Sequence, residues 1–331
     1  MLSGVMGNPK RRIGEVPMVG HAGVVFYSVR PLIPRRLQIA LRRMMIMRKR
    51  SACGDVWPID ETACALPQGW PGWPDGKKFA LILTHDVETE KGCEKCHTVA
   101  TMENDSGFRA SFNFVPEAYK IKESLRQNLI RDGFEVGVHG LTHDGNLYAS
   151  RNKFARSAGK INTYLKEWQS VGFRTPCMYH NLDWIGELDI EYDSSTFDTD
   201  PFEPQPDGMG TIFPFWVRNG SPSKGYIELP YTLPQDFTLF VLMKERTIDI
   251  WKKKLDWIVQ NGGMALLITH PDYMNGNKGT CGLEEYPAEF YEEFLGYVKK
   301  NYEGHYWNPL PKEVARFWKE KMVLSRTGWV R

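Results

Sequence analysis

The stretch Phe79-Ala80-Leu81-Ile82-Leu83 is an uninterrupted apolar run, and Thr84-His85-Asp86-Val87-Glu88 follows it directly. A short apolar run of this kind is typical of a strand in a parallel sheet, which is buried on both faces. Five further segments are predicted strands: Ala110–Phe114, Phe134–Val138, Ile212–Trp216, Tyr226–Leu229 and Met264–Ile268. Helical patterns lie between them, at Lys153–Trp168, Thr247–Val259 and Tyr286–Lys300. This alternation predicts an α/β fold with a parallel sheet and crossover helices.

The chain is expected to contain one large catalytic domain with additions at both ends. Its 331 residues exceed the roughly 250 that an α/β barrel needs. Residues 1–75 differ in character from the rest and are predicted to form an N-terminal extension, residues 76–310 the barrel, and residues 311–331 a C-terminal helix or tail. Because Lys and Arg (42) nearly balance Asp and Glu (40), no nucleic-acid partner is expected.

The extension contains a basic amphipathic segment, residues 35–50. Leu37, Leu41, Met44 and Met45 fall at helical spacing, and the polar face is rich in arginine. Two interpretations stay open. The helix could rest on an anionic membrane surface, or it could dock on the catalytic domain and leave its basic face in solvent.

The expected location is the cytoplasm, with peripheral contact at the inner membrane face as an option. The sequence has no apolar run approaching the ~18 residues of a membrane span, and its N-terminus lacks the pattern of a secretion signal. Six cysteines scattered over 331 residues do not suggest a disulfide framework, so reduced thiols are expected.

Three predicted strands end in residues that carry chemistry. Asp86 and Glu88 follow the first strand, His139 follows Val138, and His270 follows Ile268. The carboxyl ends of the strands form the catalytic face of a strand-helix barrel. These side chains are therefore expected to meet at that end of the barrel, which is called the mouth below.

His139 and His143 are four residues apart and can reach one ion from a single turn. Asp86 and Glu88 are two apart, so in an extended strand they share a face while His85 points to the other. Two imidazoles and one carboxylate leave coordination positions open for water, which is the pattern of a catalytic zinc site. The alternative is that the two carboxylates only cap the following helix.

Three further patterns have competing interpretations. Arg174, before Thr175-Pro176, could pair with a catalytic carboxylate or be an ordinary loop arginine. Cys93-Glu94-Lys95-Cys96-His97 matches the haem-attachment pattern, although a redox or zinc role, or two ordinary thiols on a helix, are the competing interpretations. Two histidines and a carboxylate also make the facial triad of iron oxygenases, which usually have all-β scaffolds.

These motifs together resemble the polysaccharide deacetylase family, also called the NodB-homology or carbohydrate esterase 4 group. The resemblance covers roughly residues 78–275 and rests on five segments in the family's order: Leu83–Glu88, Val138–His143, Phe173–Pro176, Tyr192–Ser195 and Leu267–Pro271. It implies a distorted (β/α) barrel, with seven strands rather than eight, and metal-dependent removal of N- or O-acetyl groups from a carbohydrate. Glu88 stands where the family commonly has an aspartate.

Carried over by position, the resemblance implies roles for individual residues. Asp86 is similar to the general base and His270 to the general acid. Glu88, His139 and His143 resemble the ligands of a divalent metal, with zinc favoured over cobalt, manganese or nickel. Arg174 would orient the base, and the backbone N–H near Cys177 would contribute to an oxyanion hole. Tyr179 and His180 are expected near the substrate, and Asp193 and Asp198 are expected to support the site from behind.

The expected substrate is an acetylated glycan or sugar precursor. The alternatives are a non-catalytic glycan-binding protein on the same barrel, and a deformylase or other amide hydrolase that acts on a lipid-linked sugar. The basic helix and the absence of a secretion signal favour an intracellular precursor over a wall polymer.

Overall fold

The computed structural model describes residues 34–54, 56–277 and 280–324, and its central feature is one nine-stranded sheet with the order β11-β1-β2-β3-β4-β5-β7-β6, with β8 paired to β1. The strands are β1 (Phe79–Val87), β2 (Ala110–Phe114), β3 (Glu135–His139), β4 (Gly172–Arg174), β5 (Tyr192–Asp193), β6 (Phe215–Asn219), β7 (Ser221–Glu228), β8 (Met264–Thr269) and β11 (Tyr306–Trp307). All pairings except β6 with β7 are parallel. The expected α/β architecture is therefore confirmed.

The sheet curls into a distorted barrel. Beyond β7, isolated parallel bridges join Phe197 to Tyr231 and Leu233 to Leu267, so this segment connects the β5 side of the sheet to β8. The strand count differs from the expected seven because the antiparallel β6 and the two-residue β11 join the same sheet. A second, two-stranded sheet pairs β9 (Met274–Asn275) with β10 (Tyr286–Pro287).

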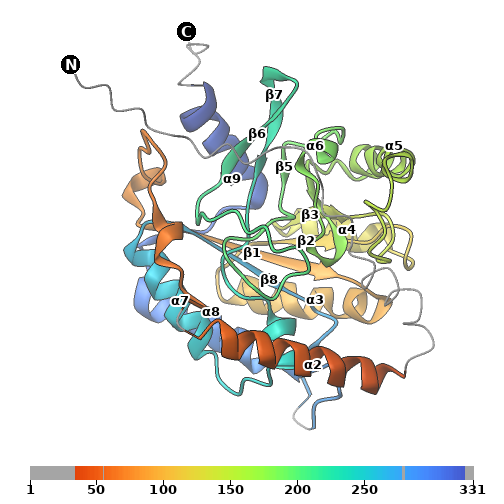
Figure 1. Cartoon of the computed structure of the whole chain (residues 1–331), viewed down its shortest axis with the longest axis vertical. Coiled ribbons are helices and arrows are strands. Elements are labelled where there is room, and N and C mark those ends of the chain that lie inside the picture. Colours follow the sequence, from red (N-terminus) through yellow and green to blue (C-terminus); the bar gives the residue numbers. More distant parts are fainter. Residues whose placement is uncertain (1–33, 55, 278–279, 325–331) are drawn as a thin grey trace.

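Helices surround the sheet (Figure 1). They are α2 (Arg35–Ala52), α3 (Glu90–Asp105), α4 (Glu123–Arg131), α5 (Arg151–Trp168), α6 (Leu182–Ile185), α7 (Asp249–Gln260), α8 (Glu289–Tyr302) and α9 (Pro311–Trp318). Short 3₁₀ turns cover Glu61–Cys64, Pro74–Gly76 and Pro176–Met178, and π-helical segments cover Phe237–Leu242 and Lys319–Leu324. None of the described helices is long and apolar enough to span a bilayer.

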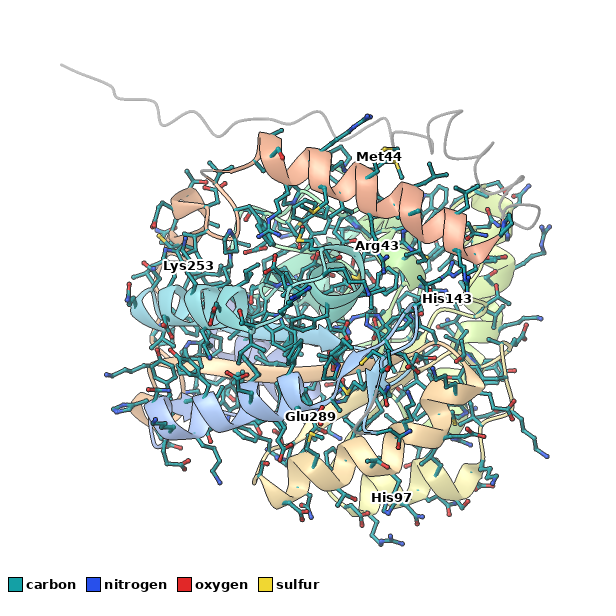
Figure 2. The ribbon with its side chains drawn as sticks, turned by 90° about the horizontal axis from the view of Figure 1, so that it is seen from below. Arg43, Met44, His97, His143, Lys253 and Glu289 are labelled. Atoms are coloured by element: carbon teal, nitrogen blue, oxygen red, sulfur yellow. The ribbon has the colours of Figure 1, made fainter. Side chains whose placement is uncertain are left out.

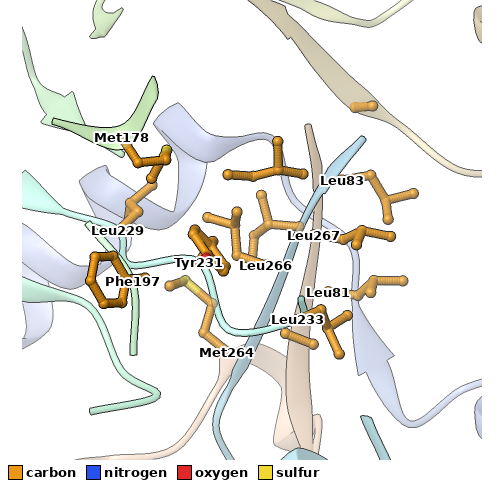
Figure 3. Packing of buried hydrophobic residues seen from close by; sticks show 14 of the residues in the cluster. Leu81, Leu83, Met178, Phe197, Leu229, Tyr231, Leu233, Met264, Leu266 and Leu267 are labelled. Atoms are coloured by element: carbon orange, nitrogen blue, oxygen red, sulfur yellow. The ribbon is translucent and has the colours of Figure 1, made fainter. Parts of the chain in front are cut away.

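One part of the hydrophobic core lies where β1 and β8 face the segment that closes the barrel. Leu81 and Leu83 of β1 and Leu266 of β8 are buried, and Tyr231 and Leu233 pack beside them (Figure 3). Burying a large apolar side chain contributes about 1.5–3 kcal/mol, so this apolar centre stabilises the strands whose ends carry the polar residues.

Several predicted element boundaries were wrong, as two examples show. The strand expected at Ile212–Trp216 begins only at Phe215, because Ile212 and Phe213 lie in a bend and pack into the core instead. The helix expected from Tyr286 begins at Glu289, since Tyr286 belongs to β10. Conversely, β1 continues four residues beyond Leu83 and carries His85 and Asp86 within the strand.

The described part of the extension packs on the barrel. Ile39 and Ile46 of α2, Ala63 and Trp73 all belong to the hydrophobic core. The expectation of a docked helix with a solvated basic face is corrected in one respect. The α2 helix docks through Ile39 and Ile46, several of its arginines contact the barrel beside them, and Leu37 and Met44 are exposed. Arginine stems can cover apolar surface while their guanidinium groups pair with carboxylates at its edge.

Candidate metal centre and catalytic mouth

Three predicted ligands converge at the carboxyl ends of β1 and β3. Glu88, His139 and His143 each offer one ligand atom, and these atoms lie within 4.8 Å of one another. Within residues 34–54, 56–277 and 280–324 this is the one group of at least three His, Cys, Asp or Glu side chains with such geometry. His143 Nε2 lies 3.0 Å from Glu88 Oε1.

The side chains in this group fit a divalent metal. His139 Nδ1 lies 3.1 Å from the Arg174 carbonyl oxygen, so the proton belongs on Nδ1 and Nε2 keeps its lone pair. Burial, more than any other effect, lowers the pKa of His139 to about 4, which keeps the imidazole neutral near pH 7. His143 Nε2 is buried without a hydrogen-bond partner among the described residues. Burial opposes the charged form of His143, but Glu88 raises its pKa. A bound metal would take the place of that proton, and two imidazole nitrogens with a carboxylate form a donor set that suits zinc.

Asp86 is held next to this group by Arg174. Arg174 Nη1 donates to Asp86 Oδ1 at 2.9 Å, and Asn113 Nδ2 donates to the same oxygen at 3.0 Å. Burial alone would raise the pKa of Asp86, but Arg174 and the neighbouring histidines lower it to about 2. Asp86 Oδ2 lies 3.9 Å from His139 Nε2. An ionised carboxylate with one oxygen turned toward the ligand group is suited to accept a proton there.

Arg174 itself is fixed by four hydrogen bonds. Its Nε and Nη2 atoms donate to the Ser194 backbone oxygen and to Ser194 Oγ, and Nη1 donates to Thr84 Oγ1 as well as to Asp86. Only 1% of this side chain is exposed. The interpretation of Arg174 as an ordinary solvated loop residue is therefore wrong.

A glycine makes room for the amide that supports Asp86. Gly137 lies opposite Asn113 in the β2–β3 register, and a Cβ atom at Gly137 would come within 2.1 Å of Asn113 Oδ1. The missing side chain in β3 therefore lets the Asn113 amide sit against the strand and reach Asp86.

His270 enters the mouth from the end of β8 and is oriented by Asp236. His270 Nδ1 lies 2.6 Å from Asp236 Oδ1, and the His270 backbone N–H donates to Asp236 Oδ2 at 2.7 Å. His270 Nε2 lies 3.8 Å from Glu88 Oε1. Burial opposes the charged form, yet Asp236, followed by Glu88, raises the pKa of His270 to about 10. His270 therefore carries a proton near neutral pH and presents Nε2 to the mouth.

Glu88 is positioned by two residues from the loop after β8. The Tyr273 hydroxyl donates to Glu88 Oε2, and the Glu88 backbone N–H donates to Asp272 Oδ2 at 3.0 Å. Burial opposes ionisation of Glu88, but His143 and His270 hold its pKa well below the usual range. The alternative role as a helix cap is not supported, since α3 begins after Thr89 with no side-chain capping bond.

The segment Phe173–Pro176, called the arginine-proline element, packs against the loop that carries His139 and His143. Cys177 and Met178 both have positive φ (61° and 56°), which forces a tight turn after Pro176. Gly140 has φ of 66°, and a Cβ there would approach Pro176 Cδ to 2.4 Å, so only glycine fits between the two loops. A hollow beside them is lined by Thr142, Gly145, Leu147, Thr175, Pro176 and Tyr179.

The remaining predicted residues differ in how directly they contact the residues of the mouth. His180 Nδ1 lies 3.2 Å from the Met178 carbonyl oxygen, and its Nε2 lies 3.3 Å from Asp207 Oδ2. Asp193 accepts a hydrogen bond from Ser195, which in turn accepts the Thr175 backbone N–H, so Asp193 supports the arginine-proline element through one intermediate.

Asp198 has a different partner. Asp198 Oδ2 pairs with Lys254 Nζ of α7 at 2.7 Å, and both side chains are almost fully buried. This ion pair connects Asp198 to the helix layer rather than to the ligand group.

The cysteine motif lies on α3, where Cys96 is buried and His97 is exposed. Figure 2 shows His97 at the surface, well away from His143. Burial raises the pKa of Cys93 to about 11 and raises that of Cys96 further, so both thiols stay protonated near neutral pH. These surroundings favour two ordinary thiols over a redox or metal-binding pair. The parallel α/β sheet likewise disfavours the iron oxygenase alternative.

Asp236 and Asn113 orient predicted site residues but were not themselves predicted from the sequence. Asp236 lies 34 positions before its partner His270, in a segment without strand periodicity. Asp272 and Tyr273 directly follow His270-Pro271 at a strand end, and that position in the sequence already indicates that they lie near the mouth.

The fold has known relatives among solved structures. A protein assigned as a polysaccharide deacetylase from Mycobacterium smegmatis matches with a TM-score of 0.57 and 18% identity, over 79% of this chain and 96% of that one. Puue allantoinase matches with a TM-score of 0.61 and 15% identity, over 80% and 98%. Another protein assigned as a polysaccharide deacetylase, from Pseudomonas aeruginosa PAO1, matches with a TM-score of 0.56 and 15% identity, over 76% and 94%.

The chain therefore has the fold of the polysaccharide deacetylases, as the sequence resemblance implied. No protein-family model matches the sequence, and no curated protein matches it.

Proposed function

We propose that this protein is a metal-dependent hydrolase that removes acyl groups from an amide or ester of a carbohydrate. Acetyl is the favoured acyl group. The observation that carries the proposal is the convergence of a ligand group, an ionised carboxylate and a protonated imidazole at one mouth. Asp86 is held ionised by Arg174, and His270 is held protonated by Asp236. Each has the protonation state that its part of the reaction requires.

Glu88, His139 and His143 would hold the metal, most suitably zinc. When bound, the metal would polarise the acyl carbonyl and make a water molecule more acidic. Asp86 would take the proton of the attacking water, because its second oxygen faces the ligand group. His270 would then give its Nε2 proton to the departing nitrogen or oxygen. The backbone N–H near Cys177 would stabilise the negative charge on the acyl oxygen.

The carbohydrate part of the proposal is supported by the fold shared with proteins assigned as polysaccharide deacetylases. A second candidate is an amide hydrolase that acts on a small non-sugar compound, because Puue allantoinase has the same fold with a TM-score of 0.61. The residues of the mouth would serve either substrate, since an N-acylated sugar and a small amide are both cleaved by water at a carbon–nitrogen bond.

The test is an assay with the full-length protein that measures released acetate and formate for the acylated sugars and the ring-opened product, allantoate, for allantoin. Acetylated chitooligosaccharides, a nucleotide-linked N-acetylhexosamine, an N-formylated amino sugar and allantoin are supplied separately, each with and without a chelator. Chelator-sensitive acyl release from a sugar supports the main proposal. Turnover of allantoin alone would replace it with the second candidate, and no turnover of any compound by zinc-loaded protein would favour a glycan-binding protein.

The role of Asp236 is tested by an Asp236→Asn variant, with the pH profile as the measurement. Asp236 is the main group that raises the pKa of His270, so its neutralisation should lower that pKa. Loss of activity on the alkaline side should then begin at lower pH, while the acidic side stays unchanged. A uniform decrease at every pH would indicate only a structural role for Asp236.

A further inference from the structure

The outer side of α2 is an apolar stripe, although the helix is strongly basic. Leu37, Ala40, Met44 and Met47 recur at intervals of three, four and three residues and share one side of the helix. Leu37, Met44 and Met47 are 51%, 46% and 43% exposed. Figure 2 shows Met44 on the outer side of α2 and Arg43 on the side that faces the rest of the molecule. These four residues are called the α2 stripe below.

The stripe points outward because the opposite side of α2 is firmly attached. Ile39 and Ile46 are buried in the core. Arg35 pairs with Glu284 and Arg50 pairs with Glu245. Arg43 adds hydrogen bonds of 3.1 and 3.2 Å to the backbone oxygens of Val241 and Leu283. The helix is thus fixed at both ends and in the middle, and it cannot turn its apolar stripe inward without breaking these contacts.

The residues beside the stripe are cationic. Arg36 and Arg48 are exposed and flank it, and α2 contains no Asp or Glu among its 18 residues. An apolar stripe with basic flanks is the pattern of a helix that lies in the interface of a membrane, where apolar side chains enter the acyl region and cations meet anionic headgroups. From the stripe and its flanks we infer that α2 docks this protein on an anionic lipid surface.

The positive charge beside the stripe disfavours two other binding partners, a second copy of the chain and the chain's own residues 1–33. In a dimer that packs two copies of the stripe together, the flanking arginines of one copy would face those of the other, and like charges repel. Residues 1–33 carry Lys10, Arg11, Arg12 and Arg30 against the single acidic Glu15, so they do not complement the helix either. An anionic lipid surface satisfies both the apolar and the cationic side chains.

Docking would place lipid close to the catalytic mouth. The guanidinium of Arg42 lies 4.8 Å from the ring centre of Phe237, and Phe237 packs on Tyr273 with ring centres 4.7 Å apart. Tyr273 donates its hydroxyl hydrogen bond to Glu88. The helix that docks is therefore two side chains away from a proposed metal ligand. If the hydrolase proposal also holds, a lipid-linked sugar is the substrate class that suits this placement.

Vesicle cosedimentation of the full-length protein tests the inference directly. Vesicles of phosphatidylcholine alone are compared with vesicles that also contain phosphatidylglycerol, at low and at physiological salt. We expect binding to the anionic vesicles that weakens with salt. The Arg36→Gln/Arg48→Gln variant should lose about 25-fold in affinity, because each basic residue near an anionic surface contributes about fivefold.

The stripe is tested with a Leu37→Ser/Met44→Ser variant, which should bind anionic vesicles at least about tenfold more weakly, since two apolar side chains no longer enter the lipid. Leu66→Ser is the matched control, because Leu66 is 64% exposed but lies outside α2. It should bind as the wild type does. The thermal midpoint and zinc content of all variants should stay unchanged, because every substituted side chain is exposed.

Two results would overturn the inference. One is wild-type protein that does not bind anionic vesicles, or that binds them no better than the stripe variant does. The other is a concentration-dependent dimer that disappears in the stripe variant, which would assign the stripe to a second copy of the chain. Hydrolysis of a soluble substrate is measured in parallel. Its loss would affect only the hydrolase proposal, since the stripe residues do not touch the mouth.

Discussion

Two groups of buried carboxylates in this protein differ in charge state, although both are shielded from water. At the mouth, the pKa values of Asp86 and Glu88 are lowered. Elsewhere in the barrel, burial raises the pKa of Glu135 to about 7 and lifts that of Glu228 well above its usual value. The mouth has Arg174 and three imidazoles, while Glu135 and Glu228 accept hydrogen bonds from uncharged groups such as the Tyr192 and Thr196 hydroxyls.

The difference shows that partner charge, rather than burial, decides whether a carboxyl group here is ionised. The mouth holds groups ready for proton transfer, whereas the other carboxyl groups act as hydrogen-bonded links between strands. Glu135 illustrates the second role, because it accepts the Tyr192 hydroxyl of β5 and the Lys312 backbone N–H at the start of α9.

The largest effect is expected from neutralising a carboxylate at the mouth. Asp86→Asn should lower kcat about 10²–10⁴-fold, because a general base typically contributes that much. Glu135→Gln is the matched control, as it neutralises an equally buried carboxyl group away from the mouth, and its kcat should stay near the wild-type value. Zinc content should be unchanged in both variants. Equal kcat losses in the two variants would show that the carboxylates at the mouth and those elsewhere in the barrel do not differ in their role in catalysis.

The next effect concerns stability. Arg174→Gln removes the cation beside Asp86, and breaking a buried ion pair in this way should destabilise the fold by about 3–5 kcal/mol. Denaturant unfolding near pH 7 measures this loss. The pKa of Asp86 should rise toward that of Glu135, so the difference in stability between variant and wild type should shrink at low pH. A variant with wild-type stability at pH 7 would show that Arg174 is not what keeps Asp86 ionised.

A third prediction uses the raised pKa of Glu135. Because the folded-state pKa is about 7 and the ordinary value is 4.5, the protonated carboxyl stabilises the fold below pH 4.5. This contribution, on the order of 3 kcal/mol, should be lost as the pH rises through 7. Unfolding free energies measured from pH 4.5 to 8 should show this slope in the wild type. In Glu135→Gln the slope should be smaller by this contribution, and a slope equal to that of the wild type would contradict the assignment.

The smallest effect is expected at the surface. Arg316 pairs with both carboxylate oxygens of Glu191, and 57% of the arginine side chain is exposed. Arg316→Gln should cost less than about 1 kcal/mol, because water and salt screen an exposed pair. Compared with Arg174→Gln, this variant separates the effect of an ion pair from the effect of its burial. A loss as large as that of Arg174→Gln would contradict the comparison.

Much of the fold and the mouth could be predicted because the evidence is local. The apolar run from Phe79 marks β1, and Asp86, His139 and His270 follow or end strands, so parallel pairing brings them to one edge. The four-residue spacing of His139 and His143 likewise indicated a shared ion. The structure confirms that His85 turns away, since it contacts Thr269 and Glu103.

What could not be predicted depends on long-range packing. The strands β4 and β5 have three and two residues, which is too short for any periodicity to appear. Asp236 belongs to the mouth only because the chain before the π-helical segment returns to the end of β8. The side on which α2 docks depends on Glu284 and Glu245, which lie 249 and 195 residues after their partners Arg35 and Arg50.

The most direct test of the central claim measures zinc content and acetate release on the same samples. We predict about one zinc ion per chain, held by Glu88, His139 and His143, and parallel loss of zinc and activity on chelation, with recovery when zinc is returned. The His139→Ala/His143→Ala variant should bind no zinc and release no acetate, although it stays folded. Full activity in the chelated protein or in this variant would contradict the account.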